Sequence, residues 1–161
     1  MTVGIGFDVH PLVPGRRLVL GGVEIPFEKG LKGHSDADVL AHAVIDAILG
    51  AASAGDIGSC FGTDDPKYRN VSSLLLLGEA FRKVEALGYE VGHIDATIIA
   101  EAPKLGPYIA QMRTNLADIV GGAFEDVSVK ATTANGVGVL GAGDGIACLA
   151  IASLRRRGTT G

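Results

Sequence analysis

The chain has 161 residues, of which 47% are hydrophobic and 20% charged, a composition typical of a folded globular domain and not of a disordered chain. Its formal net charge of −4 argues against a nucleic-acid-binding protein, which usually has a basic surface. Two cysteines are too few for a disulfide framework, and no signal peptide or uncharged membrane-length run is present, so we expect a cytoplasmic protein. We expect one domain over residues 1–157 and a flexible tail over 158–161.

The first half of the chain contains an extended region, one apolar helix and a long loop. Its predicted elements are a strand over 2–12, a hairpin over 16–27 that turns at Gly21-Gly22, a helix over 34–53 and an irregular loop over 55–73. Ser35 or Asp36 is expected to cap this helix. The 24 glycines are about twice the usual share, which indicates tight turns or backbone that must approach a neighbour closely.

In the second half, helices and strands alternate. The predicted elements are a helix over 72–88, a strand over 90–101, a helix over 107–122, a strand over 126–133, a glycine-rich connection over 134–145 and an apolar segment over 146–154. Periodicity leaves that last segment open between strand and helix. If it is a strand, its composition suggests burial on both faces, by helices or by another subunit. The alternation predicts an α/β (α+β) two-layer sandwich, a mixed sheet with helices on one face.

Three side chains suggest a metal site. Asp8 and His10 are two apart on the first predicted strand and therefore point to the same face. A helix packed on that face would bring His42 to the same point, and two imidazoles with one carboxylate leave a zinc ion one open position. Asp38 and Asp46, each one helical turn from His42, are candidate hydrogen-bond partners for its ring. An acid and a histidine two apart also occur by chance, so spacing alone leaves the assignment open.

Three segments suit an anionic ligand. His34 and Ser35 precede the first predicted helix, where backbone N–H groups favour anions. Lys104 lies on a turn after a strand, and Thr132 and Thr133 end another strand; ammonium and hydroxyl groups both donate to phosphate. Taken singly, each segment is better explained as a helix cap, a solvated lysine or an ordinary strand end, and the anion-binding interpretation depends on their presence together with the metal triad.

The segments "GFDVHPL", "GHSDADVLAHAVIDAILGAA", "GDIGSCF", "IIAEAPKLGPYIAQMR", "VKATT" and "GDGIAC" occur in this order between about Val3 and Leu154. Together they resemble the 2-C-methyl-D-erythritol 2,4-cyclodiphosphate synthase family of the non-mevalonate isoprenoid pathway. The resemblance implies a homotrimer whose sheets face a central channel, with active sites between subunits. It also implies a phosphorus–oxygen lyase that cyclises 4-diphosphocytidyl-2-C-methyl-D-erythritol 2-phosphate and releases CMP. The location would be the cytoplasm, or the plastid stroma if a transit peptide had been removed.

The resemblance also assigns site residues. Asp8, His10 and His42 match the zinc ligands, and His34 and Thr133 match the two groups that stabilise the transition state. A second cation, Mg²⁺ or Mn²⁺, would bridge the diphosphate. The expected substrate contacts are Asp8, Val9, His10, His34, Ser35, Asp56, Ile57, Gly58, Phe61, Gly62, Thr63, Asp64, Asp65, Ala100, Glu101, Ala102, Pro103, Lys104, Leu105, Gly106, Thr132, Thr133, Ala134 and Asn135.

The chain departs from the family pattern at several positions. Asn135 stands where a glutamate usually binds the second cation, and a neutral oxygen is a weaker ligand for a hard cation. In the 61–65 loop the central acid is shifted to Asp64. Val139 and Ala142 replace the usual phenylalanine and arginine near the trimer axis. We therefore expect weak or no binding of an isoprenoid diphosphate in the channel, and calorimetry with farnesyl diphosphate would test this.

Two other functions share some of these features. Two histidines and a carboxylate also form the facial triad of non-haem iron oxygenases, although those sites usually lie in all-β jelly rolls and this chain predicts three helices. A trimer that binds zinc without catalysis is the other alternative. His34, Thr133 and Lys104 argue against it, because a structural zinc site has no need of them.

Overall fold

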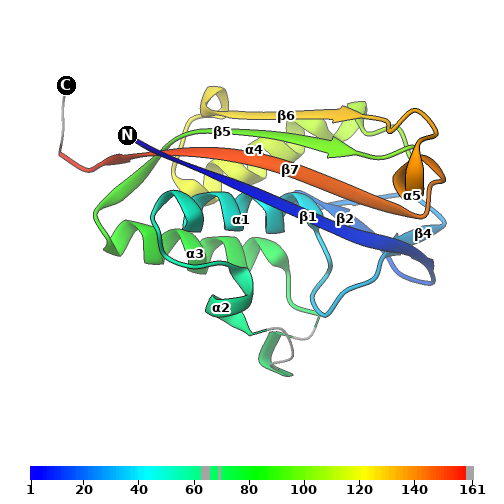
Figure 1. The fold of residues 1–161 in the computed structure, drawn as a ribbon, viewed down its shortest axis with the longest axis horizontal. Helices are drawn as coiled ribbons and strands as arrows, with labels where there is room; N and C mark the ends of the chain where they lie inside the picture. Colours follow the sequence, from blue (N-terminus) through cyan, green and yellow to red (C-terminus); the bar gives the residue numbers. More distant parts are fainter. Residues whose placement is uncertain (63–65, 69, 159–161) are drawn as a thin grey trace.

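The structure, a computed structural model, describes residues 1–62, 66–68 and 70–158 and consists of a sheet layer and a helix layer (Figure 1). The strands are β1 (Thr2–Pro14), β2 (Leu18–Leu20), β3 (Val23–Ile25), β4 (Lys29–Leu31), β5 (Tyr89–Ile99), β6 (Val127–Thr132) and β7 (Gly145–Arg156). The helices are α1 (Val39–Ala51), α2 (Ile57–Phe61), α3 (Ser73–Ala86), α4 (Ile109–Val120) and α5 (Gly138–Gly141), with 3₁₀ turns η1 (Pro66–Tyr68), η2 (Gly106–Tyr108) and η3 (Phe124–Asp126).

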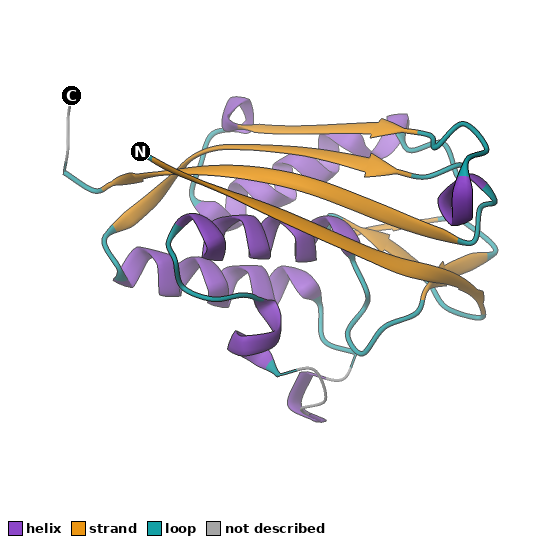
Figure 2. Cartoon of the chain, in the orientation of Figure 1, coloured by secondary structure: helices purple, strands orange, loops and turns teal. Residues whose placement is uncertain are grey.

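The main sheet is mixed, with strand order β4-β1-β7-β5-β6. Only β5 and β6 run parallel, so the segments that follow these two strands leave the sheet at the same edge. α1, α3 and α4 all lie on one face (Figure 2). The predicted two-layer sandwich with a mixed sheet is therefore confirmed, and the open segment over 146–154 is a strand, β7.

The hairpin forms as predicted from its two glycines. β2 and β3 pair with Leu20 opposite Val23, so Gly21 and Gly22 make a two-residue turn. Both have positive φ, 56° and 70°, a conformation that glycine adopts without steric cost. The turn lies over α1, where Asp38 accepts hydrogen bonds from both glycine amides.

Helix α1 is the centre of the core. It is apolar on nearly all sides because it lies between the sheet and α3, and most of its residues are fully buried. Gly4 and Gly6 on β1 allow this helix to approach the strand closely. A Cβ on Gly6 would lie 1.9 Å from the carbonyl oxygen of Ala43, and one on Gly4 would lie 2.2 Å from that of Ala47.

The face of the sheet opposite the helices carries exposed apolar side chains in the single chain. β1 exposes alternate residues while Gly4, Gly6, Asp8 and His10 point towards α1. The prediction that the last strand is buried on both faces is not met within one chain, since Leu149 and Ile151 are 40% and 45% exposed. The exposed apolar residues of this face are Val3, Ile5, Phe7, Val9, Leu149 and Ile151.

Several predicted boundaries are wrong. The first long helix begins at Val39 and not at 34, because Asp38, rather than Ser35 or Asp36, is its N-cap and accepts from the amides of Leu40 and Ala41. The loop over 55–73 contains α2 and η1, and the glycine-rich connection contains α5. Among the described residues, none of the helices is long and apolar enough to cross a membrane.

Candidate functional site

A cluster of Asp8, His10 and His42 lies where the N-terminal turn of α1 meets β1. One ligand atom from each of these residues lies within 4.8 Å of the other two. The Asp8 Oδ2 atom is 3.2 Å from His10 Nε2 and 2.9 Å from His42 Nδ1. The glycines before Asp8 on the same strand face set this geometry, because they let α1 approach until His42 reaches the strand. Gly33 leaves room for the His10 ring, since a Cβ there would lie 3.1 Å from its Cε1.

The electrostatics of the cluster favour an ionised carboxylate. Burial alone would raise the pKa of Asp8, but hydrogen bonds and charges from His10 and His42 outweigh it and hold that pKa well below its usual range. The hydrogen bond to Asp8 raises the pKa of His10, and burial opposes this. An anionic oxygen between two imidazoles is a donor set that suits Zn²⁺ and leaves one position open for a ligand.

The far side of the His42 ring contacts two serines: Ser35, an expected substrate contact, and Ser73, which the sequence did not indicate. Its Nε2 lies 2.8 Å from Ser73 Oγ and 3.1 Å from Ser35 Oγ. Ser73 donates its only hydroxyl hydrogen to the Asp36 carboxylate, so it accepts from His42 Nε2–H. We therefore assign a hydrogen to Nε2, which leaves Nδ1 as the nitrogen that faces Asp8 Oδ2 at 2.9 Å and whose lone pair a metal would take in place of the present hydrogen bond. Such a partner orients a metal-binding histidine.

The predicted partners of His42 were wrong. Asp38 is fully buried and accepts from backbone amides of the hairpin and of α1, while Asp46 accepts from the amide of Ile57. Both carboxylates are one helical turn from His42, but their hydrogen bonds come from backbone amides. Ser73 and Asp36 lie 31 and 6 residues from His42 in the chain, and no local spacing connects the three.

His34 and Ser35 do not lie at the N-terminus of the first helix as predicted. They lie in the irregular segment before it, and that segment is tied to the one before α3 by Asp36 N–H donating to the Val71 carbonyl and Asn70 N–H to the His34 carbonyl. Arg16 adds a hydrogen bond to the Ser35 carbonyl at 2.8 Å. Both residues nevertheless line the pocket beside the metal cluster.

That pocket has a volume of about 200 Å³. Besides the three cluster residues it is lined by His34, Ser35, Ile57, Gly58, Phe61, Gly62, Tyr68 and Leu76. Asp56, predicted as a substrate contact, is exposed and caps α2 by accepting from the amide of Ser59. Val9 is 48% exposed on the opposite face of β1. Thr63, Asp64 and Asp65 lie outside the described residues.

A second cavity, of about 430 Å³, lies at the edge of the sheet where β5 and β6 end. Eight of the expected substrate contacts line it: Ala100, Glu101, Pro103, Lys104, Leu105, Gly106, Thr132 and Thr133. The amide of Ala100 donates to the Thr132 carbonyl at 2.9 Å and holds the two strand ends together. Within one chain, β7 lies between the metal cluster on β1 and this cavity at the ends of β5 and β6.

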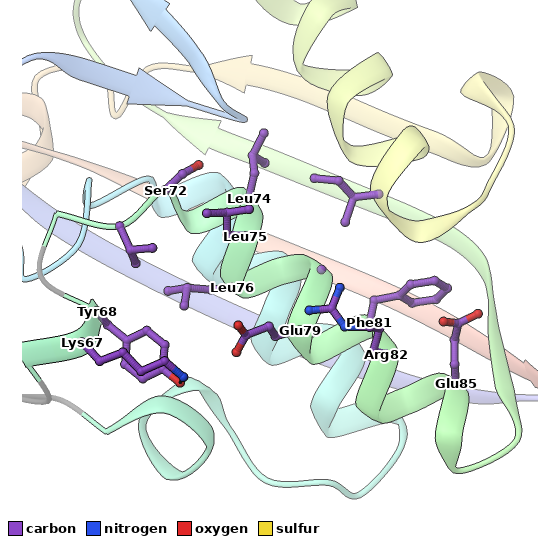
Figure 3. A pocket seen from close by; sticks show the side chains of 13 residues that line it. Lys67, Tyr68, Ser72, Leu74, Leu75, Leu76, Glu79, Phe81, Arg82 and Glu85 are labelled. Carbon is purple, nitrogen blue, oxygen red and sulfur yellow. The ribbon is translucent and has the colours of Figure 1, made fainter.

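A larger hollow of about 540 Å³ runs along α3 (Figure 3). Leu74, Leu75, Glu79 and Arg82 line it from the helix, while Lys67 and Tyr68 lie on the facing 3₁₀ turn. Its walls are mainly aliphatic, and its charged groups are of both signs. The three candidate metal ligands line the pocket of about 200 Å³ and not this larger hollow, so pocket size alone does not identify the candidate active site.

Comparison with known proteins agrees with this site. A sequence profile of the YgbB family matches residues 1–155. The chain belongs to the YgbB family. It is 56% identical to the 2-C-methyl-D-erythritol 2,4-cyclodiphosphate synthase of Desulfatibacillum aliphaticivorans, over 96% of this chain and 99% of that protein. The resemblance inferred from the motifs is therefore confirmed.

Solved structures of the family share the fold. The bifunctional IspDF of Campylobacter jejuni superposes with a TM-score of 0.93 at 42% identity and covers 96% of this chain, which spans 42% of that longer chain. A 2C-methyl-D-erythritol-2,4-cyclodiphosphate synthase in a CDP-bound form gives a TM-score of 0.87 at 33% identity, over 95% of this chain and 99% of that one. This sheet-and-helix architecture differs from the jelly rolls that usually hold facial-triad iron.

Proposed function

We propose that the protein is a 2-C-methyl-D-erythritol 2,4-cyclodiphosphate synthase that acts as a phosphorus–oxygen lyase. An oxygen of the substrate's 2-phosphate forms a bond to the β-phosphorus of the diphosphate. The bond from that phosphorus to the bridging oxygen breaks, and CMP leaves with the bridging oxygen and its electron pair. The observation that carries the proposal is the Asp8–His10–His42 cluster beside a pocket, in a chain 56% identical to a named synthase.

Asp8, His10 and His42 would hold Zn²⁺, which supplies Lewis-acid polarisation of phosphate oxygens when bound. Ser73 keeps the His42 lone pair directed at the cluster. His34 lines the same pocket, where its ring can donate to a phosphate oxygen. Positioning and neutralisation of charge account for most of the catalysis in phosphoryl transfer, and these residues serve both purposes.

The cavity that contains Lys104 is the proposed cytidine site. Its lining loop comes from the ends of two parallel strands, and a synthase of the family has been solved in a CDP-bound form. Thr133 would donate to the diphosphate. The second cation, Mg²⁺ or Mn²⁺, has only a neutral oxygen available from Asn135, which accepts the Thr133 hydroxyl at 3.1 Å until that hydroxyl turns to the diphosphate. We therefore expect this cation to be held mainly by substrate phosphates and water.

We propose a homotrimer with active sites between subunits. The metal cluster and the cytidine cavity are two to three strand spacings apart in one chain, about 10–14 Å at the usual spacing between strands. We therefore place a substrate that contacts both sites between the metal cluster of one subunit and the cavity of a neighbouring subunit. The exposed apolar face of β1 and β7 is a surface that such an assembly would bury. Free Cys60 and Cys148 fit the proposed cytoplasmic location.

The test is phosphorus NMR of the purified protein with the diphosphocytidyl substrate, zinc and magnesium. We expect CMP release and a cyclic diphosphate signal. His42→Ala should lose zinc and activity together, while His93→Ala, which removes an exposed histidine from the other face of the sheet, should keep both. Unchanged substrate with fully loaded wild-type protein would refute the synthase function and favour a non-catalytic zinc protein.

A further inference from the structure

Glu101 connects the two segments that form the proposed cytidine and diphosphate sites. It follows the end of β5, and its side chain reaches the segment that follows β6. Its Oε1 atom accepts a hydrogen bond from the amide of Ala134 at 2.8 Å and a longer one from the amide of Gly136 at 3.4 Å. The two amides flank Asn135 and converge on the same carboxylate oxygen.

The backbone at this point presents two amides to one oxygen acceptor. Asn135 and Gly136 both have positive φ, 53° and 75°, and such a turn directs successive amides to one side, where they form a concave site for an anion. Asparagine tolerates this left-handed conformation better than most residues. The Glu101 carboxylate fills the concavity and thereby fixes the conformation of Asn135.

Asn135 in turn contacts the hydroxyl of Thr133. The Thr133 Oγ1 atom donates to Asn135 Oδ1 at 3.1 Å and accepts from the Asn135 amide at 3.3 Å. The position of the Thr133 oxygen therefore depends on the turn that Glu101 holds, and the hydroxyl hydrogen has to turn from Asn135 Oδ1 to a phosphate oxygen when substrate binds. A sequence of contacts runs from the Glu101 carboxylate through the backbone of Ala134–Gly136 to the group proposed to donate to the diphosphate.

We propose that Glu101 is a positioning residue for the cyclisation, acting through Asn135 on Thr133. This inference rests on the synthase function proposed above. Glu101 needs no contact with the reacting atoms in this role. What matters is an oxygen acceptor at the Oε1 position, and the negative charge is secondary. Glutamine supplies the same acceptor without the charge, so the two properties can be separated.

The experiment compares Glu101→Ala and Glu101→Gln with wild type in kcat, KM, zinc content and melting temperature. Loss of hydrogen bonds to a charged group predicts a decrease in kcat of roughly ten- to a hundredfold for Glu101→Ala. Zinc content and melting temperature should stay at wild-type values, because the turn is at the surface and provides none of the three candidate metal ligands. Glu101→Gln should recover most of the activity. Glu90→Ala, which removes a carboxylate from the start of β5, is the matched control and should behave as wild type.

A double-mutant cycle identifies the residue through which Glu101 acts. If the effect passes through Thr133, Glu101→Ala should cause little further loss in a Thr133→Ala background. Fully additive losses would overturn the inference, as would a Glu101→Gln variant as slow as Glu101→Ala, since that result assigns the role to the charge. A wild-type rate in Glu101→Ala overturns the inference and leaves the synthase function intact. Absence of CMP release by the wild type overturns both.

Discussion

The close approach of α1 to β1 predicts that Gly6→Ala damages the fold and the metal cluster together. The new Cβ would lie 1.9 Å from the Ala43 carbonyl oxygen and 2.8 Å from the Ala47 amide nitrogen. Ordinary contacts begin at 3.4 Å, so the strand and helix must separate by about 1.5 Å. Both atoms belong to the backbone of a buried helix, and no side-chain rotation relieves the contact.

The expected magnitude follows from this displacement. Overpacking of a well-filled core costs typically 1–3 kcal/mol, and a backbone contact places this variant near the upper end, at about 3 kcal/mol. For a chain of this length that corresponds to a decrease in melting temperature of roughly 6–12 °C. Metal ligands tolerate errors of only about 0.2 Å, so moving Asp8 and His10 away from His42 should weaken zinc binding at least about tenfold.

The assay is differential scanning calorimetry together with a zinc competition titration. Gly50→Ala is the control, because its Cβ would lie 3.9 Å from the Ile5 carbonyl oxygen on the same helix–strand interface. Alanine is favoured over glycine inside a helix by about 1 kcal/mol, so this control should be slightly stabilised. A Gly6→Ala protein with wild-type melting temperature and zinc affinity would refute the role given to the close approach.

Three further predictions concern the helix layer and the open face of the sheet. Ser73→Ala should weaken zinc binding about ten- to a hundredfold with little loss of stability; an unchanged affinity in a competition titration would show that Ser73 does not orient His42. Burial raises the pKa of Asp38 to about 6, above its ordinary value of 3.8, so the folded state holds this proton more tightly and the stabilisation present at low pH is lost as pH rises through 6. The free energy of unfolding of wild type relative to Asp38→Asn should therefore fall by about 2 kcal/mol between pH 4 and pH 7. A difference in urea midpoints that is independent of pH would contradict this. Phe7→Glu should convert the proposed trimer to monomers in sedimentation velocity. Leu75→Glu, which places the same charge on α3, should leave the trimer intact. If the Phe7→Glu variant still sediments as a trimer, the exposed face of β1 and β7 is not the interface.

The sequence by itself determined most of the architecture. Periodicity and turn residues located the long helices, the hairpin and the early strands, because these depend on contacts within a few residues. Spacing two apart placed Asp8 and His10 on one face of a strand, since strand geometry alone requires it. The family resemblance rested on several segments in fixed order, and a profile of the family confirmed it over residues 1–155.

Tertiary structure decided the surroundings of the site. Ser73 and Asp36 orient His42 because the segments before α1 and α3 lie side by side, and no local pattern encodes that pairing. Asp38 and Asp46 have the helical spacing of partners for His42, yet nearby backbone amides bind them first, because a buried amide must find an acceptor. Glu101 likewise holds the turn after β6 only because β5 and β6 are parallel and their ends meet at one edge of the sheet.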